Sequence, residues 1–135
     1  MIAVIVITHG QFGQELLRTA QDIAGRQDNV ASLSVMPEMG LDSVCQALVD
    51  AMTRFPSADG TLILVDMLGG TPCNTALLKT KDLAAEVVTG VNLYMILSSF
   101  THRGDMALSA LAVKVADDGK RAIVLAKDLL RKKMA

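Results

Sequence analysis

The sequence predicts an α/β protein whose core is a doubly wound parallel sheet with helices on both faces. Short aliphatic and β-branched runs, such as 1–8 and 61–66, are typical of strands buried on both faces. Segments with apolar residues at helical spacing separate these runs. No repeat, low-complexity stretch or linker divides the 135 residues, so we expect a single domain over 1–135.

The first part of the chain predicts a strand, a helix and a second strand. Residues 1–8 are apolar without polar alternation, which indicates a strand with no exposed face. In 11–24 the apolar residues have helical spacing, and Gly25 can end the helix that this spacing predicts. Apolar residues alternate with serines in 30–35, so this strand is expected to be half exposed, near an edge of the sheet.

The middle of the chain predicts two helices on either side of the third strand. The clearest amphipathic pattern runs over 41–52 and predicts the first of them. Residues 55–60, which include a proline and a glycine, break this helix before the strand. The second helix is expected over 71–81, because Thr71 can cap it and Pro72 suits its first turn.

The last third of the chain predicts a short strand over 86–89, two helices and a final strand. Asn92 can cap the first helix, and apolar residues at helical spacing predict the second over 108–119. Residues 121–126 have an apolar centre, which favours a last strand added at an edge of the sheet. A helix is the alternative for this segment, because apolar residues continue beyond it.

Right-handed crossover connections restrict the strand order, and 2-1-3-4 is the commonest order for a chain of this length. A crevice then opens between strands 1 and 3 at their carboxyl ends. His9 directly follows the first strand and Asp66 ends the third. Because adjacent strands lie about 4.8 Å apart, these two side chains are expected to meet there.

A histidine beside a carboxylate suits nucleophilic chemistry. A carboxylate that accepts a hydrogen bond from one ring nitrogen fixes the imidazole and stabilises positive charge that develops on it. The other nitrogen is then free to react. Taken singly, His9 could be an ordinary loop residue and Asp66 a turn residue, but their joint position at the crevice favours a catalytic pair.

The turn after the third strand has the composition of an anion-binding site. Gly69 and Gly70 allow a tight turn that aims N–H groups into the crevice, and Thr71 adds a hydroxyl. The following helix contributes partial positive charge at its N-terminus. The turn lacks the spacing of a Walker loop or a dinucleotide fingerprint, so a phosphoryl group is the expected ligand. An ordinary strand-to-helix turn is the alternative.

Composition excludes several other classes of protein. The net charge is −1, so no nucleic-acid partner is expected. The apolar segments are too short to cross a bilayer, and no charged region precedes the first one as in a signal peptide. Cys45 and Cys73 have no metal-ligand spacing and are interpreted as reduced thiols of a cytoplasmic protein. We therefore expect no metal and no cofactor.

Three segments occur in a specific order: IVITHG at 5–10, LVDMLGGTPCN at 64–74 and VVTGVNL at 87–93. Together they resemble the IIA component of the mannose family of the bacterial phosphoenolpyruvate:sugar phosphotransferase system (PTS). The resemblance extends from residue 1 to about residue 125.

The resemblance implies a mannose-type IIA domain, a phosphotransferase with a phosphohistidine intermediate. By position, His9 would accept phosphate from phospho-HPr on its ε nitrogen and pass it to a IIB component for sugar uptake. Asp66 would pair with the imidazole, and Thr71 would help to hold the phosphate. The family fold adds an antiparallel strand that the subunits of a homodimer exchange, which would be 121–126. Contact with a membrane transporter complex would come through the partners.

Leu68 departs from the resemblance, because transport members often carry an aromatic residue there. A regulatory phosphorelay protein, whose partners respond to the state of His9 without sugar transport, is therefore an alternative. A receiver domain phosphorylated on Asp66 is a weaker one, because receivers need an acidic pair after the first strand to hold Mg²⁺. The phosphodonor of dihydroxyacetone kinase has a related fold but is less similar at the glycine turn.

Overall fold

Four parallel strands form one sheet in the order β2-β1-β3-β4, as predicted. The computed structural model describes residues 1–55, 59–67 and 69–134. The strands are β1 (Ala3–His9), β2 (Val30–Val35), β3 (Thr61–Val65) and β4 (Ala85–Val88). The helices are α1 (Phe12–Ala24), α2 (Leu41–Arg54), α3 (Thr71–Thr80), α4 (Leu93–His102), α5 (Leu108–Arg121) and α6 (Ala126–Met134).

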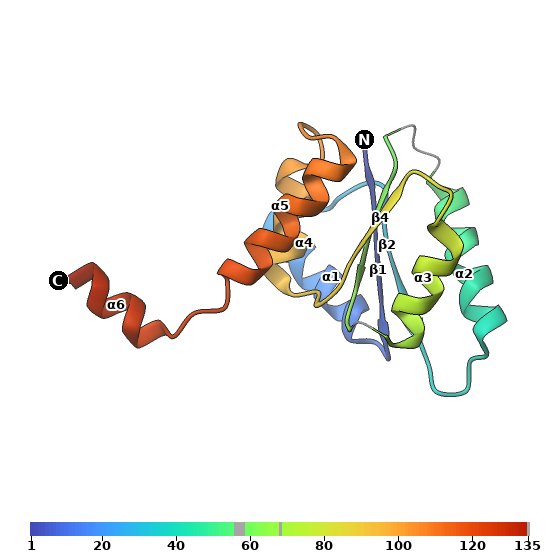
Figure 1. Ribbon diagram of the computed structural model, residues 1–135, viewed down its shortest axis with the longest axis horizontal. Coiled ribbons are helices and arrows are strands. Elements are labelled where there is room, and N and C mark those ends of the chain that lie inside the picture. Colours follow the sequence, from blue (N-terminus) through green and yellow to red (C-terminus); the bar gives the residue numbers. More distant parts are fainter. Residues whose placement is uncertain (56–58, 68, 135) are drawn as a thin grey trace.

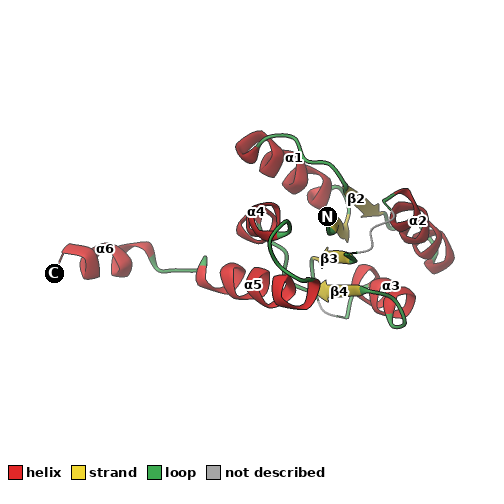
Figure 2. Ribbon diagram, turned by 90° about the horizontal axis from the view of Figure 1, so that it is seen from above, coloured by secondary structure: helices red, strands yellow, loops and turns green. Residues whose placement is uncertain are grey.

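The helices cover both faces of the sheet, which explains why the central strands are apolar throughout (Figures 1 and 2). On one face Val4 and Leu62 belong to a cluster with side chains of α1, α4 and α5. On the other face Ile5 and Ile63 pack with side chains of α2 and α3. All four are fully buried, so alternate residues of each strand complete two separate cores.

The pairing register brings the carboxyl ends of β1 and β3 to the same edge of the sheet. Ile7 lies beside Val65, so His9 and Asp66 both follow directly beyond that pair. On the other side of β1, His9 lies beside Val35 of β2, whose carbonyl accepts the N–H of Gly10 at 2.8 Å. The end of β1 is therefore fixed from both sides.

The predicted strand over 121–126 is not formed within the single chain. α5 continues to Arg121, and 123–125 link it to α6, so the described part of the chain contains no antiparallel edge strand. An apolar run forms a strand only where a neighbouring strand can take up its backbone hydrogen bonds, and 123–125 lie outside the sheet. The helical alternative describes the end of the chain better, because α6 begins at Ala126.

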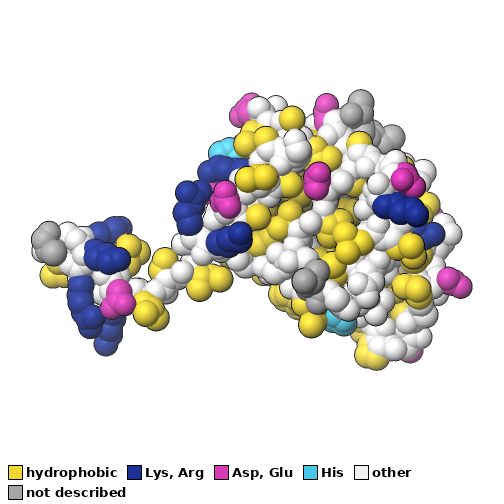
Figure 3. Space-filling model, viewed as in Figure 1, with side chains coloured by type: hydrophobic (Ala, Val, Ile, Leu, Met, Phe, Trp, Pro, Cys, Tyr) yellow, Lys and Arg dark blue, Asp and Glu magenta, His cyan; other side chains and the backbone are white. Residues whose placement is uncertain are grey.

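The C-terminal segment stands apart from the α/β body (Figure 1). Ile123 and Leu125 are 80% and 76% exposed. None of the described residues of α6 is buried, and lysine and arginine side chains surround it (Figure 3). The predicted break over 55–60 coincides with the end of α2 at Arg54, although 56–58 lie outside the described residues.

Candidate functional site

The imidazole of His9 and the carboxylate of Asp66 are in direct contact, as expected from the strand order. Nδ1 of His9 lies 2.7 Å from Oδ2 of Asp66, and the backbone N–H of His9 donates to the same oxygen at 2.9 Å. An ionised carboxylate can only accept, so Nδ1 carries the proton and Nε2 of the neutral ring has the free lone pair. The side chain of His9 is 49% exposed, so about half of it is open to solvent.

Asp66 is held as a carboxylate. Burial raises its pKa, but hydrogen bonds from the backbone and ring of His9 and from the N–H of Met67 outweigh this and leave the pKa below its usual value. The Met67 N–H donates to Oδ1 at 2.9 Å, so both oxygens have partners. The side chain is only 12% exposed, so water screens its interaction with the ring weakly.

The glycine turn lies against the imidazole. A Cβ atom on Gly70 would lie 2.7 Å from Cε1 and 3.4 Å from Nε2 of His9, so only glycine fits without moving the ring. Gly69 has a φ of +82°, a conformation that also favours glycine. Asn74 secures the turn: its side chain donates to the Gly69 carbonyl at 3.2 Å, and its N–H donates to the Gly70 carbonyl.

The predicted cap of α3 is wrong. Gly70 occupies the N-cap position with an extended backbone, and Thr71 is the first helical residue and makes no side-chain capping bond. Pro72 does lie in the first turn, as expected. The exposed Thr71 hydroxyl therefore lies at the positive end of the helix without serving as its cap, and its contact with a phosphate stays a prediction. Leu68, the departure from the family pattern, lies outside the described residues.

Sequence reasoning missed a contact that fixes the segment after His9. The hydroxyl of Thr8 accepts the N–H of Gly13 at 2.8 Å, at the start of α1. A Cβ on Gly13 would lie 2.7 Å from that hydroxyl, so the helix approaches β1 this closely only with glycine. The available signal was a hydroxyl residue at the end of an otherwise apolar strand, with a glycine five positions later.

Within the described residues, no three His, Cys, Asp or Glu side chains are grouped so that they could hold a metal ion. None of the helices described is long and apolar enough to cross a bilayer. Cys45 and Cys73 are buried free thiols.

We expect Asp66→Asn to lower stability by about 1 kcal/mol at neutral pH, because the amide replaces a charged acceptor of three donors. The lowered folded-state pKa means that Asp66 stabilises the fold above the usual carboxyl pKa of 3.8. This contribution is lost as the pH falls through the lowered value. Denaturant unfolding of both proteins between pH 7 and 2.5 checks this, with the exposed Asp82→Asn as control. A difference that stays constant down to the lowest pH would contradict it.

We expect Gly70→Ala to displace the imidazole of His9, because the new methyl group would occupy the space at Cε1. The ¹⁵N chemical shifts of the ring should change from those of a fixed Nδ1–H tautomer to those of a mixture. Gly40→Ala is the control, since Gly40 is also an extended N-cap glycine but a Cβ there meets nothing within 4 Å. Unchanged His9 shifts in Gly70→Ala would refute the close contact.

Comparisons with known proteins agree with this fold. A family model described as "PTS system fructose IIA component" matches residues 3–116. The PTS system mannose-specific EIIAB component of Escherichia coli (strain K12) is 32% identical in an alignment of 127 residues that covers 90% of this chain and 39% of that protein. The chain therefore spans well under half of that relative. The PTS system fructose-specific EIIA component of Bacillus subtilis (strain 168) is 30% identical, over 82% of this chain and 77% of its own length.

Solved structures lead to the same family. A phosphotransferase system component EIIA from Streptococcus agalactiae superimposes with a TM-score of 0.84 at 29% identity, over 95% of this chain and 99% of its own. A mannose/sorbose specific IIA subunit from Enterococcus faecalis gives 0.83 at 28% identity, over 92% and 93% of the two chains. With a family model that covers most of the sequence, these matches establish that the chain belongs to the EIIA-man family of PTS IIA components.

Proposed function

We propose that this chain is a phosphoryl carrier of the mannose-type phosphotransferase system, with His9 as the phosphorylated residue. The observation that carries this proposal is the hydrogen bond between Asp66 and Nδ1 of His9, which leaves Nε2 free on a half-exposed ring. In this function His9 takes the phosphoryl group from phospho-HPr and passes it to a IIB component, which uses it in sugar uptake.

The free Nε2 suits direct transfer of a phosphoryl group from a donor protein. The Nε2 lone pair attacks phosphorus, the new N–P bond forms, and the donor atom recovers the electron pair of the bond that breaks. Positive charge develops on the His9 ring, and the Asp66 carboxylate, which the ring contacts at 2.7 Å, stabilises it. The pair thus supplies orientation and charge stabilisation, which are the main requirements of phosphoryl transfer.

The glycine turn is the proposed holder of the phosphoryl oxygens. Gly70 lies against the edge of the ring that carries Nε2, so a group bonded to that nitrogen projects next to the turn. Free N–H groups at the N-terminus of α3 favour negative charge there. We therefore assign Gly69, Gly70 and Thr71 to phosphate binding.

Asp66 is better suited to support a phosphohistidine than to be phosphorylated itself, as in a receiver domain. Three donors already engage its carboxylate, and the side chain is mostly buried. We place the transfer in the cytoplasm, where the two free thiols remain reduced. Any contact with a membrane-embedded sugar transporter comes through the IIB partner.

The proposal predicts that phosphoenolpyruvate, enzyme I and HPr label the protein with one acid-labile, base-stable phosphoryl group. His9→Ala should abolish labelling, because the acceptor nitrogen is removed. His102→Ala should label normally, because His102 ends α4, away from the contact between His9 and Asp66. Mass spectrometry of the labelled peptide identifies the residue. Full labelling of His9→Ala, or none of the unaltered protein, would disprove the assignment.

We further propose that the protein is a homodimer in which residues 123–125 of each copy pair, antiparallel, with β4 of the other. The family resemblance implies this exchange, and exposed apolar side chains at Ile123 and Leu125 support it. β4 ends the sheet and offers a free edge. A groove of about 570 Å³ runs between β4 and α5, where hydrophobic side chains gather on the surface (Figure 3).

The dimer proposal predicts that the double variant Ile123→Glu and Leu125→Glu sediments as a monomer, because each change puts a charge into an apolar contact. Leu83→Glu is the control, since Leu83 is also an exposed apolar residue but lies before β4. Analytical ultracentrifugation over a tenfold concentration range distinguishes the states. A monomeric unaltered protein, or a double variant that remains dimeric, would contradict the exchange.

A further inference from the structure

The segment VVTGVNL resembles the family, yet the proposed chemistry gives it no role. In the structure this segment spans the end of β4 and the start of α4. The N–H of Gly90 donates to the main-chain carbonyl of Asp66 at 3.1 Å, and the N–H of Val91 donates to that of Val65 at 2.9 Å. The 90–92 loop, which we define by these residues, therefore holds the backbone from which the Asp66 carboxylate projects.

Asn92 connects this loop to two helices. Its Oδ1 accepts the N–H of Met95 at 3.0 Å, which caps α4. Its Nδ2 donates to the carbonyl of Gly119, in the last turn of α5, at 3.3 Å. The N–H of Ile123, which would reach Gly119 in a continuing α-helix, bonds to Lys120 instead. Asn92 thus supplies a donor to a helix-end carbonyl that has lost its helical partner.

α5 approaches the first turn of α4, next to this loop, unusually closely. A Cβ on Gly119 would lie 2.5 Å from Cγ of Met95 and 3.4 Å from Nδ2 of Asn92. Gly119 is 27 positions from Asn92 in sequence, so their bond is a tertiary contact that fixes the loop against the body of the protein. Gly90 has a φ of +75°, a backbone conformation that favours glycine. The bond between Asn92 and Gly119 therefore helps to hold the loop in a specific conformation.

We infer that Asn92 is a positioning residue of the phosphoryl site, which holds the 90–92 loop against α5 and thereby keeps Asp66 in place beside His9. This inference rests on the proposed function of His9. The route has three bonds: Gly119 carbonyl to the Asn92 side chain, loop N–H to the Asp66 carbonyl, and Asp66 carboxylate to the imidazole. Asn92 touches neither the ring nor the phosphoryl group and acts only through the backbone of Asp66.

The two bonds of Asn92 can be separated by substitution. Asn92→Asp and Asn92→Ser both keep an oxygen that caps α4. The ionised Asp side chain has no donor, and the Ser hydroxyl is one atom too short to reach the Gly119 carbonyl from the position of Nδ2, so both variants lose this bond. Asn92→Asp also puts a carboxylate next to that carbonyl. Both variants should fold, and thermal melts followed by circular dichroism verify this.

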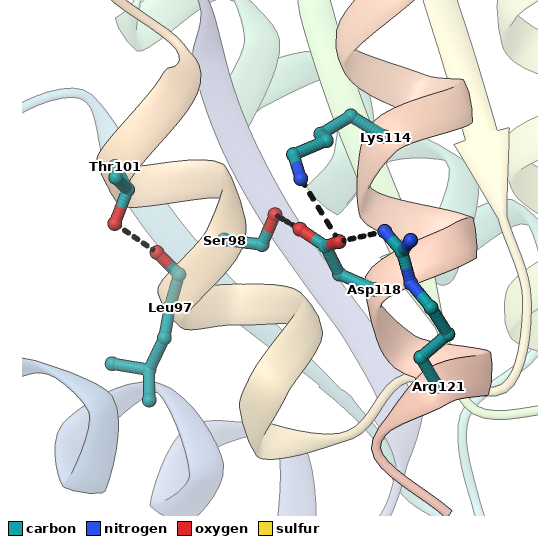
Figure 4. Close-up of polar contacts among 6 residues, drawn as sticks. All are labelled: Leu97, Ser98, Thr101, Lys114, Asp118 and Arg121. Carbon is teal, nitrogen blue, oxygen red and sulfur yellow. Dashed lines mark hydrogen bonds and ion pairs between the residues drawn. The ribbon is translucent and has the colours of Figure 1, made fainter.

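Ser98→Ala is the matched control. The Ser98 hydroxyl donates to Asp118 at 2.6 Å and so also joins α4 to α5, and Asp118 in turn accepts from Lys114 and Arg121 (Figure 4). This network lies on the same pair of helices but makes no bond to the 90–92 loop. Ser98→Ala therefore tests whether a weaker contact between α4 and α5 is by itself enough to disturb the site.

We expect both Asn92 variants to lower the maximal rate of His9 phosphorylation by roughly tenfold, with an unchanged KM for phospho-HPr, since the docking surface is intact. Ser98→Ala should transfer at the normal rate. Independently of transfer, the ¹⁵N shifts of His9 should show a larger Nε2–H fraction in both Asn92 variants than in the unaltered protein and Ser98→Ala.

Normal rates and His9 shifts in both Asn92 variants would overturn the inference, and so would equal losses in Ser98→Ala. If the unaltered protein accepts no phosphoryl group, the proposed function fails, while the ¹⁵N shifts still decide whether Asn92 positions the pair. Altered shifts with normal transfer rates would also overturn the inference, because the positioning would then have no consequence for transfer.

Discussion

The contact between His9 and Asp66 depends on the parallel pairing of β1 with β3. The two residues are 57 positions apart in sequence, and the register of the sheet alone puts them next to each other. A slip of one residue would turn every side chain of a strand to the opposite face. Such a slip of β1 would turn Ile5 into the core on the other face, so close packing in both cores protects the geometry of the polar pair. Packing of the two cores therefore determines the position of His9 relative to Asp66 at the carboxyl edge of the sheet.

Asp66 and His9 differ in their exposure to water, and each degree of exposure suits a different role in the proposed site. The carboxylate of Asp66 is largely removed from water, but three donors compensate for its burial and keep its pKa low. It is therefore a fixed negative charge at neutral pH. The ring of His9 is half exposed, which suits the proposed carrier function, because a carrier must present its nucleophile to one protein and its phosphoryl group to another. Gly70 then limits where that group can lie, since no side chain can stand between the ring and the turn.

Sequence patterns predicted the sheet order and the meeting of His9 with Asp66, because buried strands and right-handed crossovers leave few arrangements. Sequence patterns failed where the secondary structure of a segment depends on a second strand to accept and donate its backbone hydrogen bonds. Residues 123–125 are apolar enough for a strand, but in the single chain they do not lie beside the sheet. They also failed for contacts between distant segments: Asn92 was recognised as a helix cap, but its bond to Gly119 could not be read from local spacing.

The two ends of the sheet differ in how their polar groups are satisfied, and this difference explains why the site lies at only one of them. At the amino end, Arg103 is 4% exposed and donates to the carbonyls of Ile2, Asp28 and Asn29. One guanidinium thus satisfies strand-end oxygens that the packing of α4 removes from water. At the carboxyl end, glycine turns and short loops leave the imidazole open. Arg103 thus closes the amino end of the sheet, whereas the carboxyl end stays accessible for the proposed transfer.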